Sequence, residues 1–359
     1  MSVFRPAPRS AGESLFWAES RSVYDVPFES SYVAADSIWT RPIGTGAERA
    51  TAGLFKQESA RSSWPGELEY GRVLTDPEYF HLNPNDPVKT LSVTGGGPGH
   101  GDGVHVRAGA TATGAWNSCA VLLRSADPFT VWQGQPLSLA ANGNPSWPWT
   151  VPTSATEALD LREGGQRTHL GSHGGSGLST VGGSIRVGDL SGDDMIHHPL
   201  QLGINGLHFL SASNGGYRWP AVTADTGFDV DGHGNEYGGS LDHMLMGVLL
   251  ALPADYDLSA ITEPRAHKIC WTLRHYGAYV VDVTDRSWSV FQFSADNRIR
   301  TWSADAEWPM DSAHTDCIAF HQQLHGAILD LEAITNNGPG QSAAGGGAPI
   351  APGLFAPPL

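Results

Sequence analysis

Short apolar runs separated by glycine-rich turns fill the stretch from His169 to Asp282, and this pattern restricts the folds open to the chain. The whole sequence carries 44 glycines, 24 prolines and 12 tryptophans, whereas only 16% of its residues are charged. Glycine and proline destabilise helix interiors and favour turns, so many short strands and ordered loops are expected rather than a helical bundle. We predict a β-rich α+β fold, with antiparallel, sandwich-like sheets and two or three helices packed on one side.

The composition divides the 359-residue chain into three parts. Residues 1–35 contain several aromatic side chains and lack periodicity. We expect an extended arm that either lies over its own domain or docks onto a neighbouring subunit. Residues 36–335 are expected to form one main β-rich domain, long enough to bury a sizeable core. Residues 336–359 are a tail rich in glycine, proline and alanine, a composition that disfavours packed structure in an isolated chain.

Apolar spacing predicts two helices in the main domain. Thr262 can cap a helix that has Pro264 in its first turn and ends at Gly277. Its inner face would carry Ala266, Ile269, Cys270 and Leu273. The segment AYVVDV then reads as a buried strand, and a second helix is expected over residues 316–331. Further strands are expected in VHVRAGATATG and in NSCAVLLRSADPFTVWQGQPLSLA.

The charge balance and the cysteines narrow the possible partners and compartments. The formal net charge of −16 repels nucleic-acid phosphates and anionic lipids, so neither is expected as a partner. No apolar run reaches the roughly 20 residues that a membrane-spanning helix needs, and the N-terminal segment lacks the apolar region of a secretory signal. Cys119, Cys270 and Cys317 are too few and too scattered for a disulfide framework. We expect three buried free thiols in a protein that folds in a reducing cytoplasm.

Two histidine-containing motifs are candidates for chemistry. In GSHGGSGLSTVGGSIRVGDL, His173 and Asp189 flank glycines that would let the backbone approach a ligand closely, although a tight loop at a sheet corner would use the same residues. In MIHHPL, His197 and His198 would point to opposite faces of a strand, so they could not easily share a metal. His198 is a candidate general base or sugar ligand, with a structural histidine as the alternative.

Carboxylates give two further candidates. The run DTGFDVDGHGNEYGG offers Asp225, Asp229 and Asp231 at spacings that suit Ca²⁺, which is the one possible cofactor. The run does not match an EF-hand, and a solvated acidic loop is the alternative. Asp282 ends the apolar strand AYVVD and is a candidate catalytic or ligand-orienting acid. Paired with Asp242 or Asp225, it could supply the two carboxylates that glycoside hydrolysis needs.

Aromatic residues between these motifs are candidates for glycan binding. Tyr217, Arg218 and Trp219 occur together in GGYRWPA, and with His173 they form the expected glycan-binding set. Exposed rings would stack on sugars, but burial in the core is the alternative for each of them.

The segments GGSIRVGDL, IHHPL, YRWPA, MGVLLALP and HYGAYVVD together resemble a family from actinobacteria and their phages. That family shows roughly GGxIRxGEL, IRHALK, WPA, GSLLALP and YGAYVVD, and its members include minor tail proteins and secreted proteins. The resemblance covers about residues 165–290. Asp189 stands where the family has glutamate, and His197-His198-Pro199 stands where it has Arg-His-Ala. If that glutamate is catalytic in the family, the shorter Asp189 puts the activity in doubt here.

The resemblance implies a minor tail or tail-tip protein of a phage, made in the host cytoplasm, that contacts host envelope glycan outside the cell as part of the virion. Its partners would be other tail subunits, reached through the N- and C-terminal arms, in a homo-oligomer or a larger assembly. The residues themselves support an alternative, a glycan-cleaving enzyme that uses Asp282 with His198 or a second carboxylate. A carbohydrate-binding module stabilised by Ca²⁺ is a third alternative.

Overall fold

The computed structural model describes most of the expected main domain. The described residues are 37–55, 73–112, 114, 117–127, 129–147, 159–160, 171–284, 291–301, 306–309 and 315–351. The expected N-terminal arm, residues 1–35, lies outside them.

Short strands account for most of the regular structure in the described residues. They are β1 (Arg49–Thr51), β2 (Val73–His81), β3 (Val88–Thr90), β4 (Ser92–Val93), β5 (Gly103–His105), β6 (Ala120–Leu123), β7 (Thr130–Gly134), β8 (Ser138–Leu139), β9 (Pro145–Trp147), β10 (Leu159–Asp160), β11 (Leu200–Ile204), β12 (Leu249–Ala251), β13 (Ala278–Val283), β14 (Phe291–Asp296), β15 (Arg300–Thr301), β16 (Trp308–Pro309) and β17 (Glu332–Ile334). The helices are α2 (Gly206–Phe209), α3 (Pro264–His275) and α4 (Thr315–Leu329), with 3₁₀ turns η2 (Ile38–Thr40), η3 (Thr94–Gly96), η5 (Ser213–Gly215) and η6 (Leu258–Ala260).

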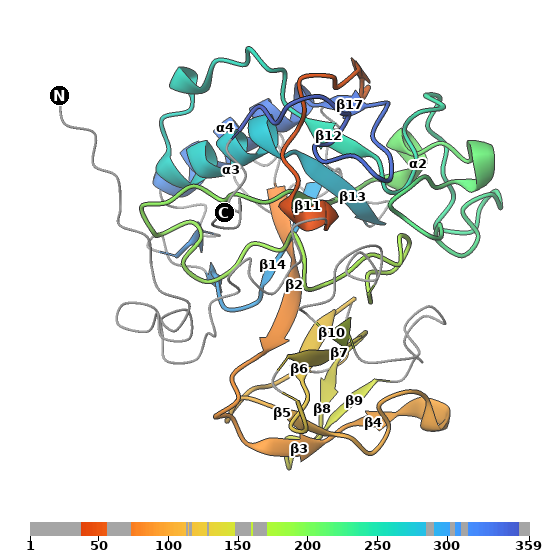
Figure 1. Ribbon diagram of the computed structural model, residues 1–359, viewed down its shortest axis with the longest axis vertical. Coiled ribbons are helices and arrows are strands. Elements are labelled where there is room, and N and C mark those ends of the chain that lie inside the picture. The colour runs from red at the N-terminus through yellow and green to blue at the C-terminus, as the bar shows by residue number, and fades with distance from the viewer. Residues whose placement is uncertain are drawn as a thin grey trace.

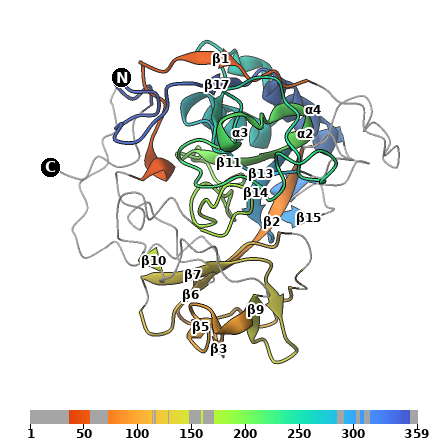
Figure 2. The ribbon, with the colours of Figure 1, turned by 90° about the vertical axis from the view of Figure 1, so that its right-hand side faces the viewer.

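One ten-stranded sheet runs through the molecule in the order β1-β17-β12-β13-β11-β14-β2-β6-β7-β10. Strand β2 connects its two parts, since it pairs with β14 as far as Glu78 and with β6 from Tyr79 onward. Figure 1 shows β2 running from a larger body, which holds the helices, into a smaller lobe formed by β3–β10. The turned view in Figure 2 shows β1 and β17 at the far end of the larger body from this lobe. Residues at the middle of β2 therefore lie at the junction of the two parts.

The sequence alternation of the central strands separates an apolar face from a polar face. In β14, Phe291, Phe293 and Ala295 belong to the main core, which also contains residues of α2, α3 and α4. Gln292, Ser294 and Asp296 alternate with them and point to the opposite face. The helices thus cover one face of the sheet, as expected. The opposite face carries polar side chains on β14 and a second apolar cluster on β12, β13 and β17.

The structure confirms the β-rich α+β class. The large sheet is mixed, because β11 and β13, β14 and β2, and β2 and β6 run parallel. Helix α3 lies between β11 and β13 in the chain, and a crossover through a helix brings the second strand back parallel to the first. The short strands suggested hairpins, which join antiparallel strands, so the sequence predicted antiparallel sheets and missed these parallel pairs.

Both predicted helices are present. The apolar residues expected on the inner face of α3 are all buried, although Glu263 rather than Thr262 caps the helix, through a hydrogen bond from the Ala266 amide. Gly277 follows α3 with a φ of +75°, and AYVVDV forms β13. Helix α4 ends at Leu329, close to the expected boundary.

The described part of the glycine-rich tail packs on its own chain. Ile43 forms a β-bridge with Ala344, and Gly44 forms one with Pro349. Ala343 and Ala344 are buried. Residues 336–351 therefore extend the main folded unit, and whether any tail residues contact other subunits stays a prediction.

Two further expectations concern cysteines and membranes. Cys119, Cys270 and Cys317 are free and buried, as predicted. Within the described residues, no helix combines the length and the apolar character needed to cross a membrane.

Gly277 gives a test of the junction between α3 and β13. A Cβ there would lie 2.6 Å from the carbonyl oxygen of Leu250, and the positive φ disfavours any other residue. We expect Gly277→Ala to lower the free energy of unfolding by about 2 kcal/mol in urea denaturation. Gly326→Ala, within α4, meets no atom within 4 Å and should instead stabilise the protein by up to about 1 kcal/mol. Equal effects of the two substitutions would contradict this account.

Candidate active site

A buried polar site lies on the face of the large sheet opposite the helices. Asp76 and Glu78 are two residues apart on β2, so both point to this face, and Asp76 pairs with Ser294 of β14. The glycine-rich loop, residues 171–184, lies against them through His173, which contacts both Glu78 and Ser294. Asp282, at the end of β13, completes the cluster.

A β-bulge brings Asp282 to this face. β13 pairs with β11 regularly up to Val280 and Leu202, after which Asp282 pairs with Gly203 and Val281 is the extra residue. A bulge re-aims the side chains that follow it. Without this shift, strict alternation would send Asp282 to the same face as Val280, into the helix-covered core.

His173 and Glu78 form a fully buried ion pair. His173 Nε2 lies 2.6 Å from Glu78 Oε1, and both side chains are 0% exposed. The hydroxyl of Ser184 donates to the other oxygen of Glu78, and Ser294 Oγ lies 3.3 Å from His173 Nε2. Burial alone lowers the pKa of His173, but Cys119 and Glu78 together raise it well above its ordinary value. Glu78 is the carboxylate in direct contact with the imidazole and favours its protonated form.

Asp282 is held by groups from both parts of the molecule. Asn117, which precedes β6 in the smaller lobe, donates from Nδ2 to Asp282 Oδ2 at 2.7 Å. The backbone N–H of Val283 donates to Oδ1 at 2.8 Å. The side chain is therefore fixed at the junction of the larger body and the smaller lobe.

The surroundings of Asp282 keep it protonated at neutral pH. Burial, followed by the nearby carboxylates Asp225 and Asp76, raises the pKa of Asp282 from 3.8 to about 8. The imidazolium of His173 and the Val283 amide oppose this shift without cancelling it. Asp282 is only 7% exposed, whereas Asp76 and Asp225 are half-buried and more open to solvent.

Asp225 approaches from the loop between α2 and β12. The Tyr237 hydroxyl donates to Asp225 Oδ2 at 2.6 Å, and the Asp225 amide donates to the same hydroxyl at 3.2 Å. Burial raises the pKa of Asp225, and its hydrogen bond with Tyr237 opposes the shift. Asp225, one of the two partners that the sequence offered for Asp282, therefore lies close enough for its charge to raise the pKa of Asp282.

Two glycines let the loop touch these carboxylates. A Cβ on Gly174 would lie 3.0 Å from Asp282 Oδ2, and a Cβ on Gly175 would overlap Asp225 Oδ2. Only a residue without a side chain allows the backbone to come this close.

Asp76, His173 and Asp282 are also the one group among the described residues that could supply three metal ligands. Their donor atoms lie within 4.8 Å of one another. However, His173 Nε2 already contacts Glu78, and Nδ1 faces the sulfur of Cys119. A cation would have to displace one of these contacts, so the arrangement suits proton transfer better than metal binding.

Cys119 lies on the other side of the His173 ring from Glu78, with its sulfur 3.9 Å from His173 Nδ1. These three residues resemble a thiol nucleophile with its base and an orienting acid. Yet Cys119 is 1% exposed, burial raises the pKa of its thiol to about 11, and its sulfur lies 3.0 Å from Gln135 Oε1. The thiolate is the reactive form, so Cys119 supports His173 and is not a nucleophile in this arrangement.

The other two predicted catalytic residues lie elsewhere. His198 precedes β11, and Asp282 pairs with Gly203 near the far end of that strand, so the two are separated by roughly five residues, or about 16 Å. Burial lowers the pKa of His198 to about 4. Asp189 accepts a hydrogen bond from the Arg186 amide, and its carbonyl accepts from Lys268 of α3. His198 is therefore too far from Asp282 to act with it, and Asp189 is engaged by Arg186 and Lys268.

The predicted glycan-binding set is divided. His173 belongs to the site but is fully buried, so it cannot touch a sugar. Arg218 donates to the carbonyls of Thr335 and Asn337 and holds the C-terminal segment. Trp219 is half-buried, with the guanidinium of Arg41 5.8 Å from its ring. Tyr217 is 40% exposed and is the one ring of the set open to a ligand.

The three aspartates of the expected Ca²⁺ loop point in different directions. Asp229 and Asp231 are exposed, whereas Asp225 turns toward Tyr237 and Gly175. Within the described part of the chain these three aspartates form no ligand group. A solvated loop that delivers Asp225 to the site describes the observed arrangement.

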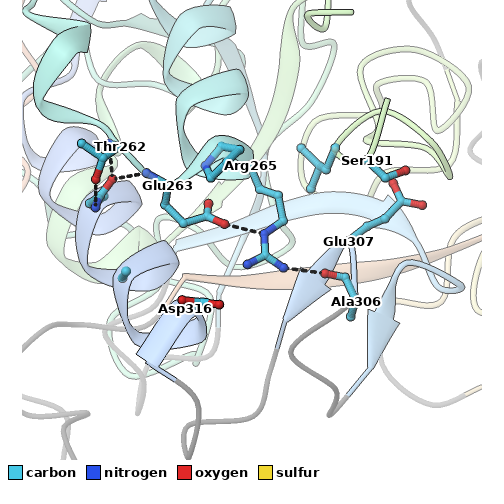
Figure 3. A pocket seen from close by; sticks show the side chains of 11 residues that line it. Ser191, Thr262, Glu263, Arg265, Ala306, Glu307 and Asp316 are labelled. Atoms are coloured by element: carbon cyan, nitrogen blue, oxygen red, sulfur yellow. Dashed lines mark hydrogen bonds and ion pairs between the residues drawn. The ribbon is translucent and has the colours of Figure 1, made fainter. Parts of the chain in front are cut away.

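A separate pocket of about 560 Å³ opens beside the first turns of α3 and α4 (Figure 3). Its polar groups hold the fold together. Glu263 caps α3 and accepts from Arg265, which also donates to the carbonyl of Ala306. Glu307 accepts from the Gly188 amide, and Gln323 accepts from the amide of Glu263. Because these groups already serve structural contacts, we place the candidate chemistry at Asp282 instead.

The sequence did not identify Asp76, Glu78, Asn117 or Tyr237. Asp76 and Glu78 alternate with apolar residues in VLTDPEYFH, but Pro77 lies between them and argues against a central strand. The neighbouring strand β14 shows the same alternation of apolar and polar residues in FQFSAD, and this alternation could have predicted a strand with one polar face.

Comparisons with protein-family models, curated proteins and solved structures gave no match. The resemblance to the actinobacterial and phage family therefore stays a prediction, and the function is argued from the site.

The raised pKa of Asp282 predicts how stability depends on pH. Between about pH 4 and pH 8 this carboxyl is protonated in the folded state and ionised in the unfolded state, so its contribution to stability falls as the pH rises. In Asp282→Asn this dependence is absent, and the stability of the variant relative to wild type should improve by roughly 2 kcal/mol or more from pH 5 to pH 8. Urea denaturation at several pH values measures the difference, with exposed Asp229→Asn as the control. Parallel curves for wild type and Asp282→Asn would contradict the assignment.

Gly175 offers a test of the loop contact. We expect Gly175→Ala to displace the Asp225 carboxylate, because the new Cβ would occupy the place of Oδ2. The Asp282 pKa should then fall, which carboxyl-resolved nuclear magnetic resonance would detect. Gly338→Ala, at a glycine that like Gly175 has no positive φ but whose Cβ would meet no atom within 4 Å, serves as the control. An unchanged Asp282 titration in Gly175→Ala would show that the contact of Gly175 with Asp225 does not influence Asp282.

Proposed function

We propose that the protein is a glycan-cleaving enzyme that hydrolyses glycosidic bonds with Asp282 as the proton donor. The observation that carries this proposal is the geometry of the cluster, in which an oxygen of buried Asp282 lies within 4.8 Å of an oxygen of half-buried Asp76. Burial and the neighbouring carboxylates also raise the pKa of Asp282. A glycosidase needs one carboxylic acid to protonate the leaving oxygen and one carboxylate to act on the sugar carbon. Asp282 supplies the acid, and Asp76 or Asp225 supplies the second group.

The raised pKa of Asp282 suits the role of a general acid. A general acid works best when its pKa lies near the operating pH, because it is then both protonated and able to release its proton. Asn117 and the Val283 amide fix the direction of the carboxyl, so proton transfer would need little reorganisation.

The glycan substrate is supported by two features of the chain. Tyr217 presents an exposed ring on the segment that leads to Asp225, and aromatic faces stack on sugars. The family resemblance also points to the cell envelope of actinobacteria. A place in a phage tail stays a separate proposal, which this enzymatic role neither needs nor opposes.

The direct test is digestion of arabinogalactan, arabinan and galactan by the purified protein, with released oligosaccharides followed by mass spectrometry. We expect Asp282→Asn to lower the rate by about 10²–10⁴-fold. Asp229→Asn, an exposed carboxylate in the loop that carries Asp225, should cleave like the wild type. Absence of cleavage by the wild type, or full activity of Asp282→Asn, would contradict the proposal.

The pH profile gives a second test. Because Asp282 must be protonated to donate, kcat/KM should decline above about pH 8. Removing the negative charge of Asp225 lowers the pKa of Asp282, so in Asp225→Asn the decline should begin at a lower pH. A profile whose alkaline limb does not move in Asp225→Asn would exclude Asp282 as the titrating acid.

A further inference from the structure

We infer that Asp76 is the nucleophile of this site and that glycosidic bonds are cleaved with retention of configuration, through a covalent glycosyl–Asp76 intermediate. The inference rests on the proposed function and adds the residue that attacks the sugar and the stereochemical course.

The separation of the two carboxyl groups carries the inference. Donor oxygens of Asp76 and Asp282 lie within 4.8 Å of one another. Inverting glycosidases keep their carboxyl groups about 6.5–9.5 Å apart to leave room for a water molecule, whereas retaining enzymes place them about 5–5.5 Å apart. The 4.8 Å limit between one oxygen of each group is below the separation of inverting enzymes and close to that of retaining enzymes. This closeness favours direct attack by a carboxylate.

Asp76 fits the nucleophile better than Asp225 does. A nucleophilic carboxylate must be ionised, and the donor atoms of Asp76 and His173 lie within the same 4.8 Å limit. His173 carries positive charge through its ion pair with Glu78. The Asp225 Oδ2 oxygen is engaged by the Tyr237 hydroxyl at 2.6 Å and lies against Gly175.

The scaffold also holds Asp76 more firmly. Asp76 lies within β2, in the stretch that pairs with β14 from Val73 to Glu78. Asp225 lies on a loop between turns. A nucleophile must keep its position to within a fraction of an ångström, which a central strand ensures better than a loop does.

The reaction proceeds in two balanced steps. In the first, Asp282 gives its proton to the glycosidic oxygen, the bond from the anomeric carbon to that oxygen breaks, and a bond forms between the anomeric carbon and the Asp76 carboxylate. In the second, a water oxygen attacks the anomeric carbon and its proton passes to Asp282. The bond to Asp76 breaks, and the carboxylate is regenerated without any oxidant or cofactor.

The test uses the full-length protein on arabinogalactan with methanol added to the buffer. A glycosyl–enzyme intermediate can be intercepted by methanol, so we expect methyl glycosides with the configuration of the substrate, detected by mass spectrometry and nuclear magnetic resonance. An acid-quenched reaction should also yield a glycosylated peptide that contains Asp76. This wild-type measurement does not depend on the folding of any variant.

A matched pair of variants assigns the nucleophile. We expect Asp76→Ala to lose at least 10²-fold in rate and to recover with sodium azide, forming a glycosyl azide of inverted configuration. Asp225→Ala should give no azide product. Circular dichroism melting of both variants checks that each is folded.

The outcomes separate the two proposals. Products of inverted configuration without methyl glycosides would overturn the covalent Asp76 mechanism and leave glycan cleavage standing. Azide rescue of Asp225→Ala in place of Asp76→Ala would overturn the choice of nucleophile. Absence of any cleavage by the wild type would overturn the proposed function itself.

Discussion

The buried pair of His173 and Glu78 is the interaction on which the rest of the site depends. Two charges with no exposure are costly to desolvate, so the pair is stable only with good geometry and further hydrogen bonds, which Ser184 and Ser294 provide. The pair fixes the glycine-rich loop to β2. Because β2 also joins the larger body to the smaller lobe, this contact sets the relative positions of the groups that surround Asp282.

The carboxylates around this pair lower the stability of the folded protein. Asp282 is buried beside Asp225 and Asp76, and their mutual repulsion raises its pKa. A protein selected only for stability would place these carboxylates apart on the surface. Such strained electrostatics are characteristic of functional sites, where activity is gained at a cost in stability. The bulge at Val281 and the absence of side chains at Gly174 and Gly175 are the local features that allow the cluster to form.

Much of the local structure followed from the sequence. Apolar spacing predicted α3 and α4, and the run AYVVD predicted a buried strand that ends on Asp282. The pairing of Asp282 with Asp225 was one of two pairings proposed, and the structure favours it over Asp242, which is exposed. These features depend on short-range patterns, which a single sequence displays directly.

Features that depend on the arrangement of distant strands could not be predicted. Asp76 and Glu78 lie close to His173 only because β2 lies next to β14. Pro77 argued against a central strand at this position, so the sequence did not predict β2. His198 and Asp189 are close to His173 in sequence, but β11 separates His198 from Asp282, and Asp189 lies in a turn that contacts α3. The Gly/Ala-rich residues of the C-terminal segment pack through backbone contacts with Ile43 and Gly44, which composition does not reveal.

The central claim is that Asp282 is a neutral acid at physiological pH. A titration of its side-chain carboxyl by ¹³C nuclear magnetic resonance, assigned by comparison with Asp282→Asn, measures this directly. The account predicts a midpoint near pH 8. A midpoint near pH 4, the ordinary range for aspartate, would show that Asp282 is an ionised structural residue and would contradict its role as the proton donor.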